Sequence, residues 1–206
     1  MLDSKGFDLW ADGYDRSVGL SDDNGEYPFA GYREVLGLIY SRVLQMGAGR
    51  VLDIGFGTGT LTKKLYDAGC EICGQDFSER MVEIARAKMP KALLCTADFS
   101  EGLVPELRAC RYDAIIASYS LHHIDDERKA GFLRELTPLL LDGGTILIGD
   151  VAFRTRRELE LCRERAGESW DEDEHYFVYE ELQAALPKLA FTRISHCAGV
   201  FSLSRD

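Results

Sequence analysis

Residues 51–60, VLDIGFGTGT, constrain the fold of this chain more than any other stretch. Val51, Leu52 and Ile54 are typical of a buried strand, which stops at a glycine-rich turn. Three alternating glycines let the backbone turn sharply and approach a ligand closely, because they carry no Cβ: Gly55, Gly57 and Gly59. A helix expected at 61–68 would point its free N–H groups back at this loop. The stretch therefore predicts a small-ligand cradle at the C-terminal end of a parallel strand.

The residues of this loop discriminate between ligands. Dinucleotide-binding loops require Gly or Ala five places after the first glycine, where this chain has Thr60. In addition, the negative charge of Asp53 would repel a pyrophosphate, whereas it suits a ligand that carries an amine. The Gly-Lys-Ser/Thr sequence of phosphate-binding loops is absent. The strand, the acid and the glycines resemble motif I of the class I S-adenosylmethionine-dependent methyltransferases, in which the loop wraps the methionine part of the cofactor. Phe56 departs from the commonest form of that motif and either fills the methionine end or packs under the loop.

Alternating strands and helices follow the loop. Strands are expected at 71–76, 92–95, 112–118 and 145–150, helices at 78–89 and 125–140, and a turn at Gly143–Gly144. Such βα units imply a parallel sheet with helices on both faces. Two last strands, 191–196 and 200–203, are joined by too few residues for a crossover, so they form an antiparallel hairpin.

The expected fold class is α/β: a Rossmann-like three-layer α/β/α sandwich whose mostly parallel seven-stranded sheet ends in a C-terminal antiparallel hairpin, as in the family that the loop resembles. One domain is expected over residues 1–206. It comprises an N-terminal helical cap (1–49), a cofactor-binding core (50–150) and a segment for the lid, the acceptor and the closing hairpin (151–206). The cap helix carries an apolar stripe: Val35, Leu36, Ile39, Val43 and Leu44.

Helices are also expected at 153–166 and 179–186. The acidic stretch between them, 167–175, is interpreted as a solvated loop in preference to a lid or a metal site, because its acids lack ligand spacing. We therefore predict no metal.

The resemblance assigns cofactor roles to other strand ends, where ligands bind in such sheets. Asp76 would accept hydrogen bonds from both ribose hydroxyls, and Phe77 would lie against the adenine. Asp98 would read the adenine edge with Phe99 beside it, and Ser118 would contact the methionine part. The alternatives are a solvated helix-start carboxylate for Asp76 and an ordinary Asx turn for Asp98.

The acceptor is expected to lie beyond the fourth strand, which ends in SYSLHHI. Tyr119, His122 and His123 are the candidate catalytic residues, because a histidine with a near-neutral pKa can remove a proton from an acceptor. A structural histidine is the preferred alternative, since no acid partner is evident. The resemblance also implies that Tyr14 and Tyr32 contribute to the cofactor pocket, although the aromatic stripe around Tyr14 is more simply core packing.

The composition of the chain bears on which classes of binding partner and which cellular compartment are expected. The net charge of −11 disfavours a nucleic-acid binder, which needs a basic surface. No apolar run is long enough to span a membrane, and no signal peptide is evident. The six cysteines are scattered along the chain, and we expect them to be reduced and to pack as small apolar side chains. This expectation favours a reducing, cytoplasmic setting.

The sequence therefore predicts an S-adenosylmethionine-dependent methyltransferase that acts on a small-molecule acceptor by in-line transfer. A protein that binds the cofactor without methyl transfer, a nicotinamide oxidoreductase and a nucleic-acid methyltransferase are the alternatives. Thr60 and Asp53 argue against the oxidoreductase, and SYSL stands where the nucleic-acid enzymes have Asn/Asp-Pro-Pro-Tyr/Phe. The acceptor and the oligomeric state stay open.

Overall fold

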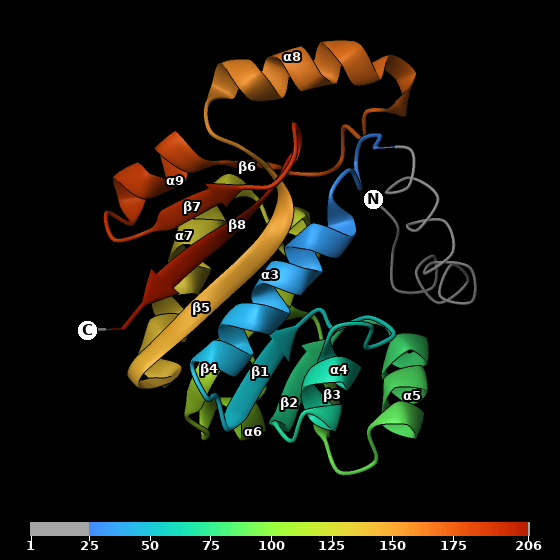
Figure 1. Ribbon diagram of the computed structural model, residues 1–206, viewed down its shortest axis with the longest axis vertical. Coiled ribbons are helices and arrows are strands. Elements are labelled where there is room, and N and C mark those ends of the chain that lie inside the picture. The colour runs from blue at the N-terminus through green and yellow to red at the C-terminus, as the bar shows by residue number, and fades with distance from the viewer. Residues whose placement is uncertain (1–24, 206) are drawn as a thin grey trace.

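The computed structural model describes residues 25–205, which are built around one sheet (Figure 1). Its strand order is β3-β2-β1-β4-β5-β8-β7, and the short β6 pairs with β5 outside this path. The strands are β1 (Arg50–Ile54), β2 (Glu71–Asp76), β3 (Leu93–Thr96), β4 (Tyr112–Ser118), β5 (Leu140–Phe153), β6 (Phe177–Val178), β7 (Ala190–Arg193) and β8 (Ala198–Ser204). The first five strands are parallel, whereas β8 runs antiparallel to both β5 and β7. The predicted fold and hairpin are confirmed, with β6 as an unpredicted addition.

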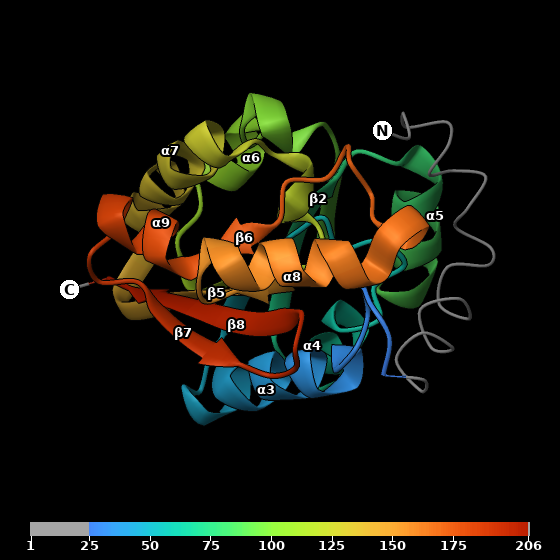
Figure 2. The ribbon, with the colours of Figure 1, turned by 90° about the horizontal axis from the view of Figure 1, so that it is seen from above.

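Helices cover both faces of the sheet. They are α3 (Tyr32–Gln45), α4 (Thr62–Asp67), α5 (Glu79–Lys88), α6 (Pro105–Arg108), α7 (Asp126–Leu136), α8 (Arg156–Ala166) and α9 (Tyr179–Ala185). The apolar sides of α3, α4 and α5 share one buried cluster, and those of α6, α7 and α9 share another (Figure 2). Adjacent strand residues alternate between these clusters, Val51 in the first and Leu52 in the second. Helix α8 lies at the end of the sheet toward which the parallel strands point (Figure 1).

Helix α3 packs directly on the backbone of β5. A Cβ at Gly149 would lie 2.3 Å from Val35 Cγ1 and 2.8 Å from Ile39 Cδ1, so only glycine allows this close approach. Four residues of the predicted stripe are buried, but Leu44 is 39% exposed. The prediction for Leu44 was wrong because it lies about 100° around the helix from Val43, beyond the face that meets the sheet.

Several predicted boundaries were wrong around β5. The expected turn at Gly143–Gly144 lies inside this strand, and the preceding helix ends at Leu136, before a 3-10 turn at Thr137–Leu139. A Cβ at Gly144 would lie 2.9–3.1 Å from three backbone oxygens, and the register with β4 is irregular here. Because β5 continues to Phe153, helix α8 begins only at Arg156, after its Thr155 cap. The hairpin connection is 194–197.

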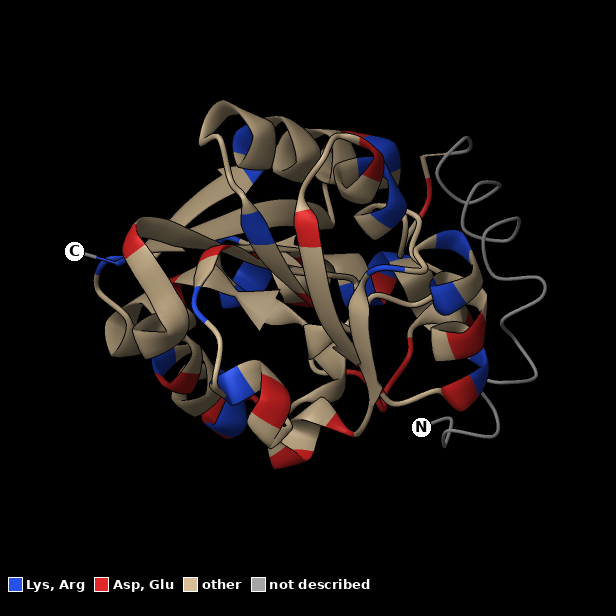
Figure 3. Ribbon diagram, turned by 90° about the horizontal axis from the view of Figure 1, so that it is seen from below, with Lys and Arg blue, Asp and Glu red and all other residues tan. Residues whose placement is uncertain are grey.

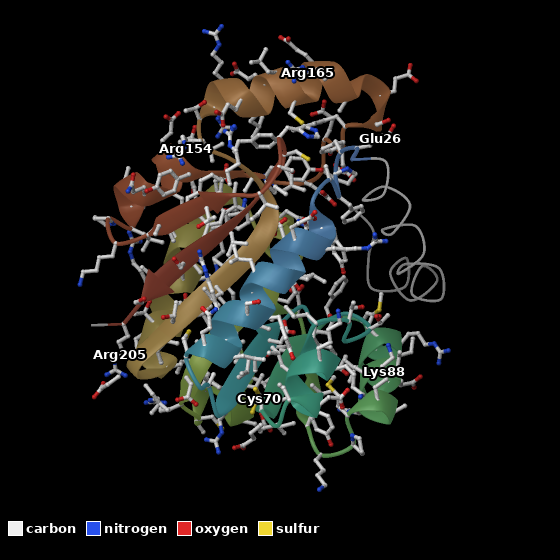
Figure 4. The ribbon with its side chains drawn as sticks, viewed as in Figure 1. Glu26, Cys70, Lys88, Arg154, Arg165 and Arg205 are labelled. Carbon is white, nitrogen blue, oxygen red and sulfur yellow. The ribbon has the colours of Figure 1, made fainter. Side chains whose placement is uncertain are left out.

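The described residues contain no helix that is long and apolar enough to cross a membrane. All six cysteines have free thiols. Cys70 precedes β2, at the end of the sheet away from the site described below (Figure 4). Residues 7–18, the expected aromatic segment that includes Tyr14, lie outside the described residues.

Candidate active site

A first cavity, of about 620 Å³, opens at the C-terminal ends of β1, β2 and β4. The predicted site residues that line it are Tyr32, Gly55, Gly57, Asp76, Phe77, Phe99, Ser118, Tyr119 and His123. Asp53, Gly59, Asp98 and His122 do not line it. The ends of three parallel strands thus bring most of the predicted residues together.

The glycine loop packs against Ser120, just beyond the end of β4, and Ser120 is hydrogen-bonded to Ile54, which precedes the loop. Gly55 has φ 68°, and its N–H donates to the Gln75 carbonyl at 2.8 Å. A Cβ at Gly55 would lie 2.3 Å from Ser120 Cβ, and the Ser120 hydroxyl donates to the Ile54 carbonyl at 2.7 Å. Both the positive φ and the close approach therefore require glycine at this position.

The other two loop glycines differ in what surrounds them. Gly57 has φ 55° and nothing within 4 Å of its would-be Cβ, so its backbone faces the open cavity. Gly59 instead packs on α5, where a Cβ would lie 3.1 Å from Met89 Cε. Lys88 of α5 also holds the loop, because its ammonium donates to the Thr58 carbonyl at 2.8 Å (Figure 4). No motif in the sequence indicated a role for this lysine.

Asp76 is held rigidly at the cavity wall. Its Oδ2 accepts the Gly57 N–H at 2.8 Å and its Oδ1 accepts the Ser78 N–H at 3.0 Å. Ser78 in turn caps α5 by accepting the Met81 N–H. Asp76 is only 4% exposed, so the alternative of a solvated carboxylate does not describe it. These two hydrogen bonds fix the direction in which the carboxylate meets the cavity.

Asp53 lies beneath the loop and is 1% exposed. Its Oδ2 accepts the Thr62 hydroxyl at 2.5 Å, whereas Oδ1 has no hydrogen-bond partner within residues 25–205. Burial raises the pKa of Asp53 to about 7, although the Thr62 hydroxyl opposes this shift and Asp76 adds to it. A nearby cation would stabilise its ionised form, so this environment fits a ligand that carries an ammonium group.

Aromatic rings form the far wall of the cavity. Phe77 and Phe99 meet edge to face, with centroids 6.4 Å apart. Asp98 is exposed and its Oδ1 accepts the Ser100 N–H at 2.8 Å, as in the Asx-turn alternative. Its adenine role therefore stays a prediction. Phe56 lines the cavity and also packs under the loop, since a Cβ at Gly74 would lie 2.6 Å from its ring.

A second cavity, of about 810 Å³, adjoins the first. Its lining comes from four separated parts of the chain: Tyr27, Pro28 and Phe29; Tyr119, His122 and His123; Val151; and Ser169, Asp171, Glu174 and Tyr176. Tyr119 and His123 line both cavities. Tyr119 has φ 50°, a strained conformation that is concentrated at functional sites.

His122 has the acid partner that the sequence analysis did not find. Its Nδ1 lies 2.7 Å from Oδ1 of Asp150. Asp150 lies in β5 and is fully buried. Burial alone would lower the pKa of His122, but the charge and hydrogen bond of Asp150 outweigh it and raise the pKa. Burial lowers the pKa of the neighbouring His123 to about 3, which keeps that ring neutral.

The segment 167–176 forms one wall of the second cavity. Trp170 stacks on Tyr27 at 5.1 Å and meets Tyr176 edge to face at 4.9 Å. The hydroxyls of Tyr27 and Tyr176 are hydrogen-bonded, and the Asp171 N–H donates to the Tyr27 hydroxyl at 3.2 Å. Most residues of the predicted solvated stretch, 167–175, are exposed, Trp170 and Glu174 are half-buried, and Tyr176, just beyond the stretch, is buried.

Comparisons with known proteins agree with this geometry. Residues 51–144 match the family model described as a methyltransferase domain. An uncharacterised methyltransferase of Geobacillus sp. (strain WCH70) is 34% identical over 194 residues, covering 90% of this chain and 88% of the relative. One from Oceanobacillus iheyensis is 32% identical over 192 residues, covering 90% and 87%.

Solved structures share the fold. Magnesium protoporphyrin IX methyltransferase from Synechocystis PCC 6803, with bound S-adenosylhomocysteine, matches with a TM-score of 0.67 at 19% identity, over 86% of this chain and 85% of its own. An S-adenosylmethionine-dependent methyltransferase from Clostridium acetobutylicum matches with a TM-score of 0.69 at 14% identity, over 93% and 98%. The chain therefore belongs to the class I S-adenosylmethionine-dependent methyltransferases, as its sequence predicted.

Proposed function

We propose that this protein transfers a methyl group from S-adenosylmethionine to a small molecule bound in the second cavity. The observation that carries this proposal is that Tyr119 and His123 line both cavities. A donor in the first cavity and an acceptor in the second would meet at these two side chains. Methyl transfer needs this contact, because its main requirement is the alignment of the two reacting atoms.

The first cavity fits the cofactor. A glycine cradle that a Cβ would fill and a fixed carboxylate, Asp76, suit an adenosyl ligand, and Asp53 suits its ammonium group. When bound, this cofactor supplies an activated methyl group on its sulfonium. Asp76 would hold the ribose hydroxyls, and the rings of Phe77 and Phe99 would exclude water from the adenosyl side.

The second cavity suits a neutral or cationic acceptor. Aromatic rings and the acids Asp171 and Glu174 line it, with Asp150 directly behind His122. Acidic and basic residues are interspersed over the described part of the chain, which favours a small molecule over nucleic acid (Figure 3). The free thiols support the proposed cytoplasmic setting.

Release of S-adenosylhomocysteine in the presence of candidate acceptors tests this function. We expect turnover with some members of a panel of small amines, thiols, alcohols and carboxylates, and none with Asp76→Ala. A protein that binds S-adenosylhomocysteine but produces none with any acceptor would instead be the cofactor-binding protein without methyl transfer.

A further inference from the structure

We propose that His122, His123 and Glu174 bind one divalent metal ion of the zinc type where the two cavities meet. One potential ligand atom from each residue lies within 4.8 Å of the others. Two imidazoles and one carboxylate are a common protein ligand set for Zn²⁺, with a fourth position left open. Metal binding itself is independent of the proposed function, although the role suggested for the ion rests on it.

The distance between the His122 and Glu174 side chains fits two ligands of one metal ion better than it fits a hydrogen bond. His122 Nε2 lies 3.5 Å from Glu174 Oε1. Hydrogen bonds of this type are ordinarily ~2.7–3.2 Å long. Two ligands of a tetrahedral Zn²⁺, each about 2.0–2.1 Å from the ion, are separated by about 3.4 Å. The observed separation is therefore that of an edge of such a tetrahedron.

The hydrogen bonds behind these ligands prepare them for a cation. Asp150 Oδ1 also accepts the Val151 N–H at 2.8 Å, so it acts as an acceptor toward His122 Nδ1. The proton therefore lies on Nδ1, and the lone pair of Nε2 points toward the Glu174 carboxylate. Two facing acceptors are satisfied either by a proton on Nε2 or by a cation between them, and the titration below distinguishes these two cases.

This arrangement also supplies the outer contacts that metal sites use. A carboxylate that binds the other nitrogen of a ligating histidine fixes its tautomer and ring orientation, as Asp150 does for His122. Tyr176, two residues after Glu174, is hydrogen-bonded through its hydroxyl to the Tyr27 hydroxyl. His122 is thereby held by a buried carboxylate from β5, and the segment that carries Glu174 is tied to Tyr27.

The position of the site suggests what the ion does. His123 lines both cavities, so an ion bound to it would lie beside the acceptor, next to the first cavity. A weakly acidic thiol or hydroxyl of the acceptor would bind the ion and release its proton to solvent. The resulting anion would form its bond to the methyl carbon as the carbon–sulfur bond breaks, and the sulfur would keep that electron pair.

Metal titration of purified full-length protein tests the site. Zn²⁺ affinity would be measured by competition with a chromogenic chelator, and the absorption spectrum of bound Co²⁺ would report the coordination. The test variants are Glu174→Gln and His123→Gln, which retain polar side chains of similar size. The matched controls are Glu172→Gln and His175→Gln, whose exposed side chains lie in the same segment.

We expect one ion per chain, at least ~100-fold weaker affinity in either test variant, and no change in the controls. Mg²⁺ should not compete, since imidazole suits zinc-type ions. Equal Zn²⁺ affinity in wild type and Glu174→Gln would overturn the proposal. So would an imidazolium at His122, seen by NMR as two protonated nitrogens that Zn²⁺ leaves unchanged. S-adenosylhomocysteine binding, measured on each protein, shows separately whether the cofactor site has failed.

Discussion

The two cavities are built in different ways. The first is lined mainly by residues of successive βα turns, including 55–58, together with Tyr32 and Leu36 of α3. The second collects side chains from 27–29, 119–123, 151 and 169–176. The first therefore depends on local backbone geometry, which a short motif can encode. The second depends on how distant segments pack, so it can change its lining without disturbing the sheet.

The family model covers the residues of the first cavity more completely than those of the second. The family model matches 51–144, which includes the loop, Asp76 and the end of β4 but not the segment 169–176. The solved neighbours include proteins named for magnesium protoporphyrin IX and for plantazolicin. Similar sheets thus accompany different acceptors, as expected if the second cavity sets the acceptor.

The largest effect should come from Gly55→Ala, which tests how strictly backbone geometry sets the first cavity. A left-handed alanine costs ~1–3 kcal/mol and the clash with Ser120 a further ~1–3 kcal/mol. We expect the free energy of unfolding to fall by about 4 kcal/mol, measured by urea denaturation, together with loss of S-adenosylhomocysteine binding. Gly69→Ala is the control, because Gly69 also has positive φ but nothing within 4 Å of its would-be Cβ. Equal losses in both variants would contradict the role of the close packing at Gly55.

The buried acid beneath the glycine loop, Asp53, predicts a pH dependence of stability. The folded-state pKa of Asp53, about 7, exceeds the ordinary value for aspartate. Between about pH 4 and 7 the unfolded chain loses this proton while the folded chain keeps it. The contribution of Asp53 to the free energy of unfolding should therefore fall as pH rises, by up to about 4 kcal/mol.

Asp53→Asn should remove this part of the pH dependence. Denaturation of wild type and variant at pH 5 and pH 8 measures it, and the exposed Asp67→Asn serves as the control. The Asp53→Asn protein should gain stability relative to wild type at pH 8. An identical difference between the proteins at the two pH values would show that Asp53 ionises normally in the folded state.

A smaller, local effect is expected in the second cavity. Tyr27→Phe removes the hydroxyl that accepts the Asp171 N–H and bonds to Tyr176, at a cost of about 1 kcal/mol. Amide hydrogen exchange at Asp171 should accelerate severalfold, while S-adenosylhomocysteine affinity stays unchanged. Tyr40→Phe, on α3, is the control. A loss of cofactor affinity in Tyr27→Phe would break the proposed division between the cavities.

Local patterns explain what could be predicted. The sheet, its antiparallel hairpin and the cradle follow from alternating βα units and from glycines that the backbone requires. The position of Asp76 was predictable because the carboxyl ends of parallel strands all lie at the same edge of the sheet, where ligands bind. The burial of Leu44 was mispredicted because the apolar pattern does not show which side of the helix meets the sheet. The Gly143–Gly144 turn was mispredicted because the two glycines lie inside β5, which the side-chain pattern does not reveal.

The second cavity was beyond local patterns. The contact between Trp170 and Tyr27 and that between Glu174 and His122 join residues far apart in the chain. No spacing in the sequence relates them. Asp150 and His122 come from neighbouring parallel strands, with Asp150 inside β5 and His122 in the turn after β4, so their contact depends on the order of the strands in the sheet.

Calorimetric titration with S-adenosylhomocysteine tests the division of the site most directly. Wild type, Asp76→Ala and Glu174→Gln would be compared in metal-free buffer. Two lost hydrogen bonds to a carboxylate, each about 1.5 kcal/mol or more, should weaken binding to Asp76→Ala by at least ~100-fold. Glu174→Gln should bind as wild type does. Undiminished binding to Asp76→Ala, or an equal loss in Glu174→Gln, would contradict the account.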